Sequence, residues 1–227
     1  MPKTLLNSHL LFTQPFEPGS VCSKDRLISI SQTPARDPIR DRVEILSLSD
    51  NELMFQVRDG DVAKLGILFE RHHVKLYNFL VRVTNRRDSS EDLVQDVFFR
   101  ILKYGHSYRG DAPFTVWMYQ LARNAASDHF RKWKNERPLE ETDDPPDQDP
   151  APDDSLVHDE RSDLLKSALA RLSKEKREVL VLSRYQELKY EEIGVILGCP
   201  VGTIKARIHH ALKDLKREYE KLTRDQS

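Results

Sequence analysis

Apolar residues recur three and four positions apart through two long stretches of this chain, and a polar segment separates the two stretches. Residues at that spacing share one face of an α-helix. In the first stretch the spacing predicts helices over 50–58, 62–85, 89–103 and 114–133. In the second stretch it predicts four more helices between 161 and 222. Because the chain holds only eight glycines, a large β-sheet is disfavoured and we predict an all-α fold.

The segment between the two helical stretches differs from both in composition. Residues 138–160 hold five prolines and ten acidic residues, with no lysine or arginine. Proline interrupts helices and like charges repel, so we expect a flexible, extended linker. The prediction is therefore two small helical domains joined by a flexible acidic linker. In chain order we expect a flexible N-terminal extension, the first domain, the linker and the second domain, over 1–45, 46–136, 137–160 and 161–224.

Residues 190–215 predict two helices joined by a tight turn. Gly198 suits the left-handed position that follows a helix, and Pro200 cannot continue one. The second helix opens at Val201, and its predicted apolar face consists of Val201, Ile204, Ile208, Leu212 and Leu215. A helix-turn-helix of this kind lays its second helix in the major groove of DNA.

The opposite face of that second helix carries small and polar side chains. At about 100° per residue, this face consists of Thr203, Ala206, His209, His210 and Lys213, with Lys205 and Arg207 on its flanks. The centre of the face suits base edges, and the flanks suit phosphates. Five lysines and arginines stand against one acid between 201 and 217, although the net charge of the whole chain is −1. The alternative is an ordinary helical hairpin with a solvated basic face.

The helix predicted over 89–103 leaves polar residues and one phenylalanine towards solvent. Its buried face includes Leu102, whereas its outer positions are Asp92, Gln95, Asp96 and Phe99. An exposed phenylalanine beside two acids indicates a surface for a partner. The alternative is that Phe99 packs on a neighbouring helix.

A loop and the helix that follows it combine aromatic and cationic residues. Residues 104–113 contain the helix breakers Gly105, Gly110 and Pro113. The helix over 114–133 is expected to bury Phe130, and its polar positions are Arg123, Asn124, Asp128, Arg131 and Lys132. Aromatic residues interleaved with cations suit stacking on unpaired bases. The alternative is a core helix with a solvated basic edge.

Three predicted helices follow residues whose side chains can accept hydrogen bonds from the first free N–H groups. We expect these residues to act as caps: Asp61, Asp88 and Ser173.

Cysteine usage and hydropathy narrow the class of protein. Cys22 and Cys199 stand far apart without a CxxC motif, which suits a reducing cytoplasm. No apolar run approaches the roughly 18 residues that span a bilayer, so we expect a cytoplasmic protein without membrane insertion. An enzyme is a third class to weigh, with Asp92 and Asp96 as a carboxylate pair, or with Cys199 and the histidine pair 209–210 as metal ligands. The sequence shows no ordered nucleophile–base set, so we expect no catalytic residue, metal or cofactor.

Three motifs in order resemble one protein family. They are EDLVQDVFFRIL (91–102), YRGDAPFTVWMYQLARNAASDHFRK (108–132) and LKYEEIGVILGCPVGTIKARIHHALKDL (188–215). Together with the acidic linker they are similar to the extracytoplasmic-function sigma factors, the compact two-domain class of bacterial transcription initiation factors. The resemblance covers about 49–222 and leaves the N-terminal extension outside.

The resemblance implies partners and roles for the outward residues. In such proteins the helix matching 91–102 binds the β′ clamp helices of RNA polymerase core, which would employ Asp92, Gln95, Asp96 and Phe99. The second domain of the family meets the β flap and the −35 promoter element, and an anti-sigma factor is a common further partner. The −35 contacts implied here are Thr203, Lys205, Ala206, Arg207, His209, His210 and Lys213.

The same resemblance implies that the loop and helix over 104–132 capture a base flipped from the −10 element. The residues implied in that contact are Tyr108, Arg109, Gly110, Asp111, Asn124, Asp128 and Lys132. Two positions depart from the family pattern. Lys189 replaces the usual Ser or Thr cap, which weakens that cap, and His210 stands where relatives often carry Arg.

The remaining alternative is a stand-alone helix-turn-helix regulator whose first domain senses a signal. Such a protein would need a ligand pocket or a phosphoacceptor arrangement in 49–134, and the sequence shows neither. Binding to polymerase core separates this class and the enzyme class from a sigma factor.

Overall fold

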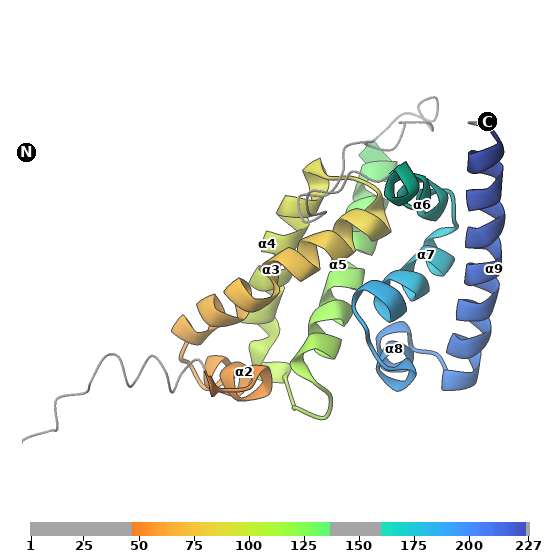
Figure 1. The fold of residues 1–227 in the computed structure, drawn as a ribbon. Coiled ribbons are helices and arrows are strands. Elements are labelled where there is room, and N and C mark those ends of the chain that lie inside the picture. Colours follow the sequence, from red (N-terminus) through yellow and green to blue (C-terminus); the bar gives the residue numbers. More distant parts are fainter. Residues whose placement is uncertain (1–46, 137–159, 226–227) are drawn as a thin grey trace, which may run out of the picture. The chain divides into compact units, whose positions relative to one another are not determined.

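The structure is a computed structural model that describes residues 47–136 and 160–225. Every regular element within these ranges is a helix, which confirms the predicted fold class (Figure 1). The predicted N-terminal extension and the acidic linker, apart from its last residue, lie outside the described residues. The elements fall into two groups, one on each side of the linker.

The first group contains α2 (Asp50–Arg58), α3 (Ala63–Thr84), α4 (Asp88–Tyr104), a short 3-10 turn at Gly105–Ser107 and α5 (Phe114–Glu136). Helix α3 packs against α2 and α4, and α4 packs against α5. Large side chains that are fully shielded from solvent fill the space between these helices, among them Leu53, Phe79, Ile101, Phe114 and Met118.

The second group contains α6 (Glu160–Ala170), α7 (Lys174–Leu180), a π-helical turn η2 (Val181–Tyr185), α8 (Tyr190–Leu197) and α9 (Val201–Asp225). Helix α9 packs against α6, α7 and α8 (Figure 1). Between α8 and α9 the backbone turns at Gly198, whose φ of 65° lies in the left-handed region that glycine adopts without strain. The predicted helix-turn-helix is therefore present, with its turn at the predicted glycine.

The described residues, 47–136 and 160–225, belong to one compact unit, in which α3 and α5 contact α7 and α5 also contacts α8. Arg123 of α5 forms an ion pair with the buried Glu178 of α7, with 3.0 Å between Nε and Oε1. Burial raises the pKa of the Glu178 carboxyl, although Arg123 acts in the opposite direction. Arg177 also donates a hydrogen bond of 3.2 Å to the backbone oxygen of Val83. Charged side chains thus contribute to the contact between the two helical groups.

Three predictions of burial are wrong. Leu102 is 43% exposed, because the buried row of α4 runs through Val94, Val97, Phe98 and Ile101. In α9 the buried row follows the 3.6-residue period from Ile204 and Ile208 to Ala211, which leaves Leu212 37% exposed.

Phe130 is 56% exposed, against the prediction that it joins the core. The buried row of α5 ahead of it consists of the small residues Ala122, Ala125 and Ala126. Small side chains bring a neighbouring helix close, and the phenyl ring one turn further on lies outside that contact.

The predicted caps are also corrected. Helix α3 begins after Val62 rather than after Asp61, and it has no side-chain cap. Asp88 is the first residue of α4 instead of the residue before it, so its carboxylate sits in the first turn. Ser173 does precede α7, but its hydroxyl makes no capping hydrogen bond. Packing of the apolar faces therefore decides where these helices begin, and the capping side chains contribute little.

Candidate nucleic-acid interface

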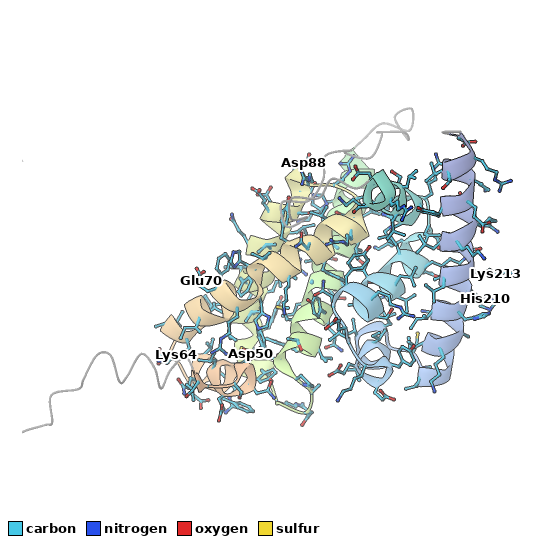
Figure 2. The ribbon with its side chains drawn as sticks, viewed as in Figure 1. Asp50, Lys64, Glu70, Asp88, His210 and Lys213 are labelled. Carbon is cyan, nitrogen blue, oxygen red and sulfur yellow. The ribbon has the colours of Figure 1, made fainter. Side chains whose placement is uncertain are left out.

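The outer face of α9 carries the residues that the helical period predicted. Thr203, Lys205, Ala206, His209, His210 and Lys213 are exposed, and Arg207 is half-buried. His210 and Lys213 project from the side of α9 that faces away from α7 and α8 (Figure 2). We call this set of seven residues the α9 face. Its centre is small and polar and its flanks are cationic, the arrangement that a major groove accommodates.

The one acid within 201–217 is neutralised by neighbouring cations. Asp214 is in contact with the ammonium group of Lys176, and its other carboxylate oxygen lies 3.2 Å from Arg217. The hydrogen bond from Lys176 is the main reason that the pKa of Asp214 is lowered. The carboxylate is half-buried and already paired, so it subtracts little from the positive potential along α9.

The turn before α9 is held by backbone contacts rather than by a side-chain cap. Cys199 donates its N–H to the backbone oxygen of Gly194 at 3.0 Å, and a Cβ at Gly194 would lie 2.9 Å from the oxygen of Cys199. At the start of α8, Lys189 has no side-chain acceptor, as expected. The Glu192 carboxylate accepts a hydrogen bond of 2.8 Å from the Lys189 N–H, which supplies half of a capping box.

The loop between α4 and α5 presents two charged residues to solvent. Arg109 and Asp111 are exposed, and Gly110 between them has a φ of 77°. On α5, Asn124 and Lys132 are exposed and Asp128 is half-buried. We call these residues, together with Tyr108, the α5 site.

Tyr108 differs from the rest of the α5 site because its side chain is buried, with 3% of its surface exposed. Its ring centroid lies 5.4 Å from that of Phe55 and 5.3 Å from that of Trp117. Its hydroxyl donates to the backbone oxygen of Ala112 at 3.3 Å. Tyr108 therefore supports the loop from its buried side, and in this position its ring is not available for stacking on a base.

Arg100 connects α4 to α5. Its guanidinium lies 3.0 Å from the carboxylate of Asp96 and 3.0 Å from that of Asp128, which also pairs with Arg131 at 3.0 Å. Burial alone would lower the pKa of Arg100, but the hydrogen bonds to both carboxylates outweigh it and raise that pKa. Asp96 and Asp128 are thus held in place by an internal cation. Sequence reasoning missed Arg100, whose spacing of four from Asp96 was the available signal.

The outer face of α4 is exposed as predicted. Asp92 and Gln95 are exposed, Asp96 is half-buried and Phe99 is 62% exposed, so the alternative in which Phe99 packs on a neighbouring helix is wrong. Leu102 follows Phe99 by three residues and lies on the same side of the helix. We call these five residues the α4 face. Its apolar part is larger than the sequence indicated.

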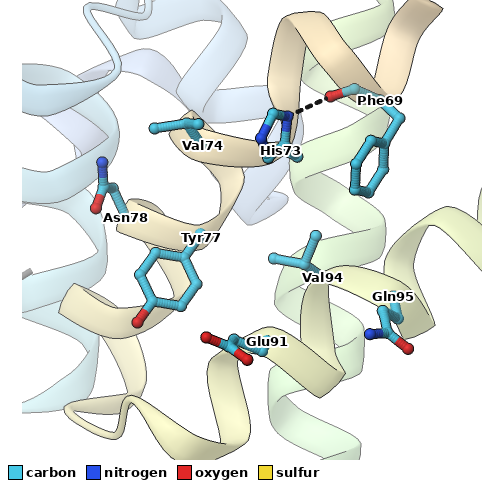
Figure 3. Close-up of a pocket in the computed structure, with 8 residues that line it drawn as sticks. All are labelled: Phe69, His73, Val74, Tyr77, Asn78, Glu91, Val94 and Gln95. Carbon is cyan, nitrogen blue, oxygen red and sulfur yellow. Dashed lines mark hydrogen bonds between the residues drawn. The ribbon is translucent and has the colours of Figure 1, made fainter. Parts of the chain in front are cut away.

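A groove adjoins the α4 face. It has a volume of about 500 Å³ and lies between α3 and α4 (Figure 3). One wall is formed by Phe69, His73, Val74 and Tyr77, and the other includes Glu91, Val94 and Gln95. The ring of His73 stacks on that of Phe69 at 4.8 Å and bonds to the Phe69 backbone oxygen at 2.9 Å. Because Gln95 belongs both to this groove and to the α4 face, the two form one continuous surface.

Two other kinds of site were weighed from the sequence. Within the described residues no group of three or more His, Cys, Asp or Glu side chains is placed to hold a metal ion. Cys199 lies half-buried in the turn, with Sγ 3.5 Å from the backbone oxygen of Leu197. Among the helices of the described ranges, none combines the length and apolar character that crossing a bilayer requires.

Two family descriptions match this chain. "Sigma-70 region 2" matches residues 68–136, which contain the α4 face and the α5 site. "Sigma-70, region 4" matches residues 162–215, which contain the helix-turn-helix and the whole α9 face.

Individual relatives match over nearly their whole length. The RNA polymerase sigma-H factor of Pseudomonas aeruginosa is 25% identical over 194 residues, 78% of this chain and 96% of the relative. The ECF RNA polymerase sigma factor SigW of Bacillus subtilis is 28% identical over 184 residues, 74% of this chain and 95% of the relative. The ECF RNA polymerase sigma-E factor of Escherichia coli is 26% identical over 187 residues, 78% of this chain and 97% of the relative.

A solved structure shares the fold. The sigma factor RpoE from Bartonella quintana, in its complex with the anti-sigma factor NepR, superimposes with a TM-score of 0.58 at 26% identity. The match covers 64% of this chain and 90% of that one.

Proposed function

Because this chain belongs to the extracytoplasmic-function sigma factors of the sigma-70 family, we propose that the three surfaces described above divide the work of promoter recognition. The protein directs promoter-specific initiation as a non-enzymatic subunit of RNA polymerase, and its partners are the polymerase core and promoter DNA. In the proposal the α9 face reads the −35 element, the α5 site captures a base of the −10 element, and the α4 face binds the core.

The assignment of the α9 face rests on one observation. A single helix in the region 4 match exposes a row of small and polar residues flanked by cations, and the one acid within 201–217, Asp214, is neutralised. Lys205 and Arg207 would reach phosphates on either side of the groove, while His209 and His210 would meet base edges. Because histidine offers fewer donors than arginine, we expect base preference at the His210 position to differ from that of relatives with arginine.

The α5 site supports a different kind of contact. Its exposed side chains come from a loop and from the outer side of α5, and they combine two cations, a carboxylate and an amide. An amide such as that of Asn124 can pair with the hydrogen-bonding edge of a base that has left the stack. Of the sequence-based set, Tyr108 and Asp128 act in this proposal through the positions of their neighbours, since one is buried and the other is paired with Arg100.

The α4 face supports the contact with the core. Phe99 and Leu102 give an exposed apolar part, and Asp92, Gln95 and Asp96 border it with polar groups on its N-terminal side. Interfaces commonly place aromatic anchors at their centre and polar groups at the rim. The groove between α3 and α4 extends this surface with further apolar side chains. A helix of the β′ clamp, with an apolar stripe and basic flanks, would complement it.

Two further parts of the proposal concern the surroundings of the protein. A sigma factor acts where polymerase and DNA are, so we place it in the cytoplasm. The Bartonella quintana relative is held in a complex with an anti-sigma factor. An anti-sigma partner of this chain would act by covering the α4 face or the α9 face.

Binding of labelled promoter duplex to the chain alone, to core alone and to their mixture tests the proposal. The α9 face is small and offers few phosphate contacts, so at moderate salt the chain alone is expected to show little sequence-specific binding. Specific binding should emerge when core is added. Strong specific binding by the chain alone, unchanged by core, would favour the stand-alone regulator instead.

A further inference from the structure

Helix α2 lies ahead of the region 2 match, which begins at residue 68, and it contacts the loop that carries the proposed −10 residues. These contacts join segments that are distant in sequence. They give α2 a role in the α5 site that neither the motifs nor the family match assigns.

The first contact is a hydrogen bond at the start of α5. The N–H of Phe114 donates to the side-chain oxygen of Asn51 at 2.7 Å, across 63 residues of sequence. Phe114 is the first residue of α5, and the first N–H groups of a helix have no partner within it. Asn51 therefore caps α5 from another helix and fixes the point where the loop ends.

The second contact fixes the middle of the loop. Gly110 has a φ of 77°, and a Cβ built there would lie 2.4 Å from the ring carbon Cζ of Phe55. The ring of Phe55 also contacts that of Tyr108 at 5.4 Å, and the guanidinium of Arg58 lies 4.8 Å from its centroid. The loop backbone between Arg109 and Asp111 is thus pressed against Phe55, which leaves the two charged side chains directed to solvent.

Helix α2 is itself anchored and so provides a firm support. Asp50, labelled in Figure 2, accepts hydrogen bonds at 2.8 Å from Arg71 and at 2.7 Å from His72 of α3. A capping box closes the start of α2, where Ser49 and Glu52 bond to one another's backbone N–H groups. The position of Asn51 and Phe55 is therefore set by α3.

We propose that Asn51 and Phe55 are positioning residues for −10 recognition: they hold the loop 108–111 and the start of α5 in the shape that receives the flipped base, without touching DNA. The proposal rests on the proposed −10 role of the α5 site. A base pocket requires its groups to be held within a fraction of an ångström of their productive positions. Here the support comes from α2, a helix that carries none of the α5 site residues.

Promoter opening by the holoenzyme tests the proposal through two substitutions at one position. Asn51→Leu keeps the number and branching of the side-chain heavy atoms but removes the acceptor. Asn51→Asp keeps an acceptor, and a carboxylate is favourable at a helix N-terminus. Val83→Ala serves as the control for lost stability, because it leaves a cavity beside the buried C-terminal part of α3. We expect Asn51→Leu to slow opening roughly tenfold and to loosen base preference at the −10 element, as the loss of one partly buried hydrogen bond predicts.

The expected pattern separates positioning from stability. Asn51→Asp should restore at least half of the rate, and Val83→Ala should keep base preference even if it lowers the melting temperature as much as Asn51→Leu does. Equal defects in both Asn51 variants, or a Val83→Ala variant with the same loss of preference, would overturn the proposal. Asn124→Ala in the same assay identifies which claim fails: if it has no effect, the −10 role of the α5 site is wrong. If Asn124→Ala slows opening and Asn51→Leu does not, only the positioning role is wrong.

Discussion

The two surfaces proposed to contact DNA are built in different ways. All seven residues of the α9 face come from one helix, and their directions follow from the helical period alone. The loop of the α5 site takes its shape from Asn51 and Phe55, which lie more than fifty residues earlier in the chain. A surface on one helix tolerates changes elsewhere in the molecule, whereas a loop depends on its support. Substitutions away from DNA should therefore damage −10 recognition and leave −35 recognition intact.

The largest effect is expected from Gly110→Ala. An alanine there meets the ring of Phe55 and also takes a positive φ that L-residues avoid, so the loop must rebuild. We expect promoter opening to fall roughly 10- to 100-fold, as strain of that kind predicts, with recruitment to the −35 element unchanged. Stopped-flow measurement of opening and a binding assay on closed complexes would check both.

Two further variants refine this prediction. Gly60→Ala imposes a positive φ of 109° in a position where a Cβ meets nothing within 4 Å, so it tests backbone strain without the collision. It should lower stability and leave opening rates per active holoenzyme unchanged. Adding Phe55→Ala to Gly110→Ala removes the collision and should recover part of the opening rate. If the fold reduction in opening rate of the double variant equals the product of the reductions measured for Phe55→Ala and Gly110→Ala, the two residues act independently.

The α4 face extends the comparison, since it too lies on a single helix. Phe99→Ala with Leu102→Ala removes two exposed apolar side chains, so the melting temperature should change little. Affinity for core should fall roughly 30-fold, the scale expected when an anchor of about 2 kcal/mol is lost. Fluorescence anisotropy with labelled core would measure the affinity.

Leu165→Ala is the matched control for that double variant. Leu165 is 38% exposed on α6, outside the α4 face, so its loss should leave core affinity unchanged. If the Phe99 and Leu102 variant melts early and binds core normally once folded, the two side chains serve the fold and the assignment of the α4 face is wrong.

A smaller effect is expected at the α9 face. Lys205→Ala should weaken closed-complex formation by the holoenzyme roughly tenfold, within the 1–3 kcal/mol that a lost contact to DNA costs. Lys221→Ala removes the same charge from the same helix about 24 Å further along, as 1.5 Å per residue gives. Electrophoretic mobility shifts should show normal recruitment for Lys221→Ala. Equal losses for both lysines would mean that α9 acts only through its overall charge.

The helical period predicts the α9 face correctly because its residues depend on one helix alone. The same reasoning is wrong at Leu212 and Leu102, where the buried row is narrower than the run of apolar residues. At Phe130 the alanine row of α5 decides which side chains are enclosed, and that depends on a partner helix. Each error concerns the neighbour that a helix face packs against. The spacing of residues within the helix carries no information about that neighbour.

The α5 site shows the same limit more sharply. The family resemblance implied that Tyr108 takes part in the −10 contact, yet contacts with Phe55 and Trp117 enclose its ring. The role of Arg100, which holds Asp96 and Asp128 together, required α4 and α5 to be placed side by side. Local patterns thus identify the residues of this site, and the packing of α2, α4 and α5 determines which of them are presented.

The central claim is that the α9 face acts on intact duplex and the α5 site acts on an unpaired base. Permanganate footprinting of holoenzymes carrying Lys205→Ala or Asn124→Ala, on a duplex promoter and on a premelted bubble, tests it most directly. We predict that Asn124→Ala forms closed complexes normally, opens the duplex poorly and recovers most reactivity on the bubble. Lys205→Ala should be recruited poorly to both templates. An Asn124→Ala variant that loses recruitment but melts DNA normally once bound would contradict the account.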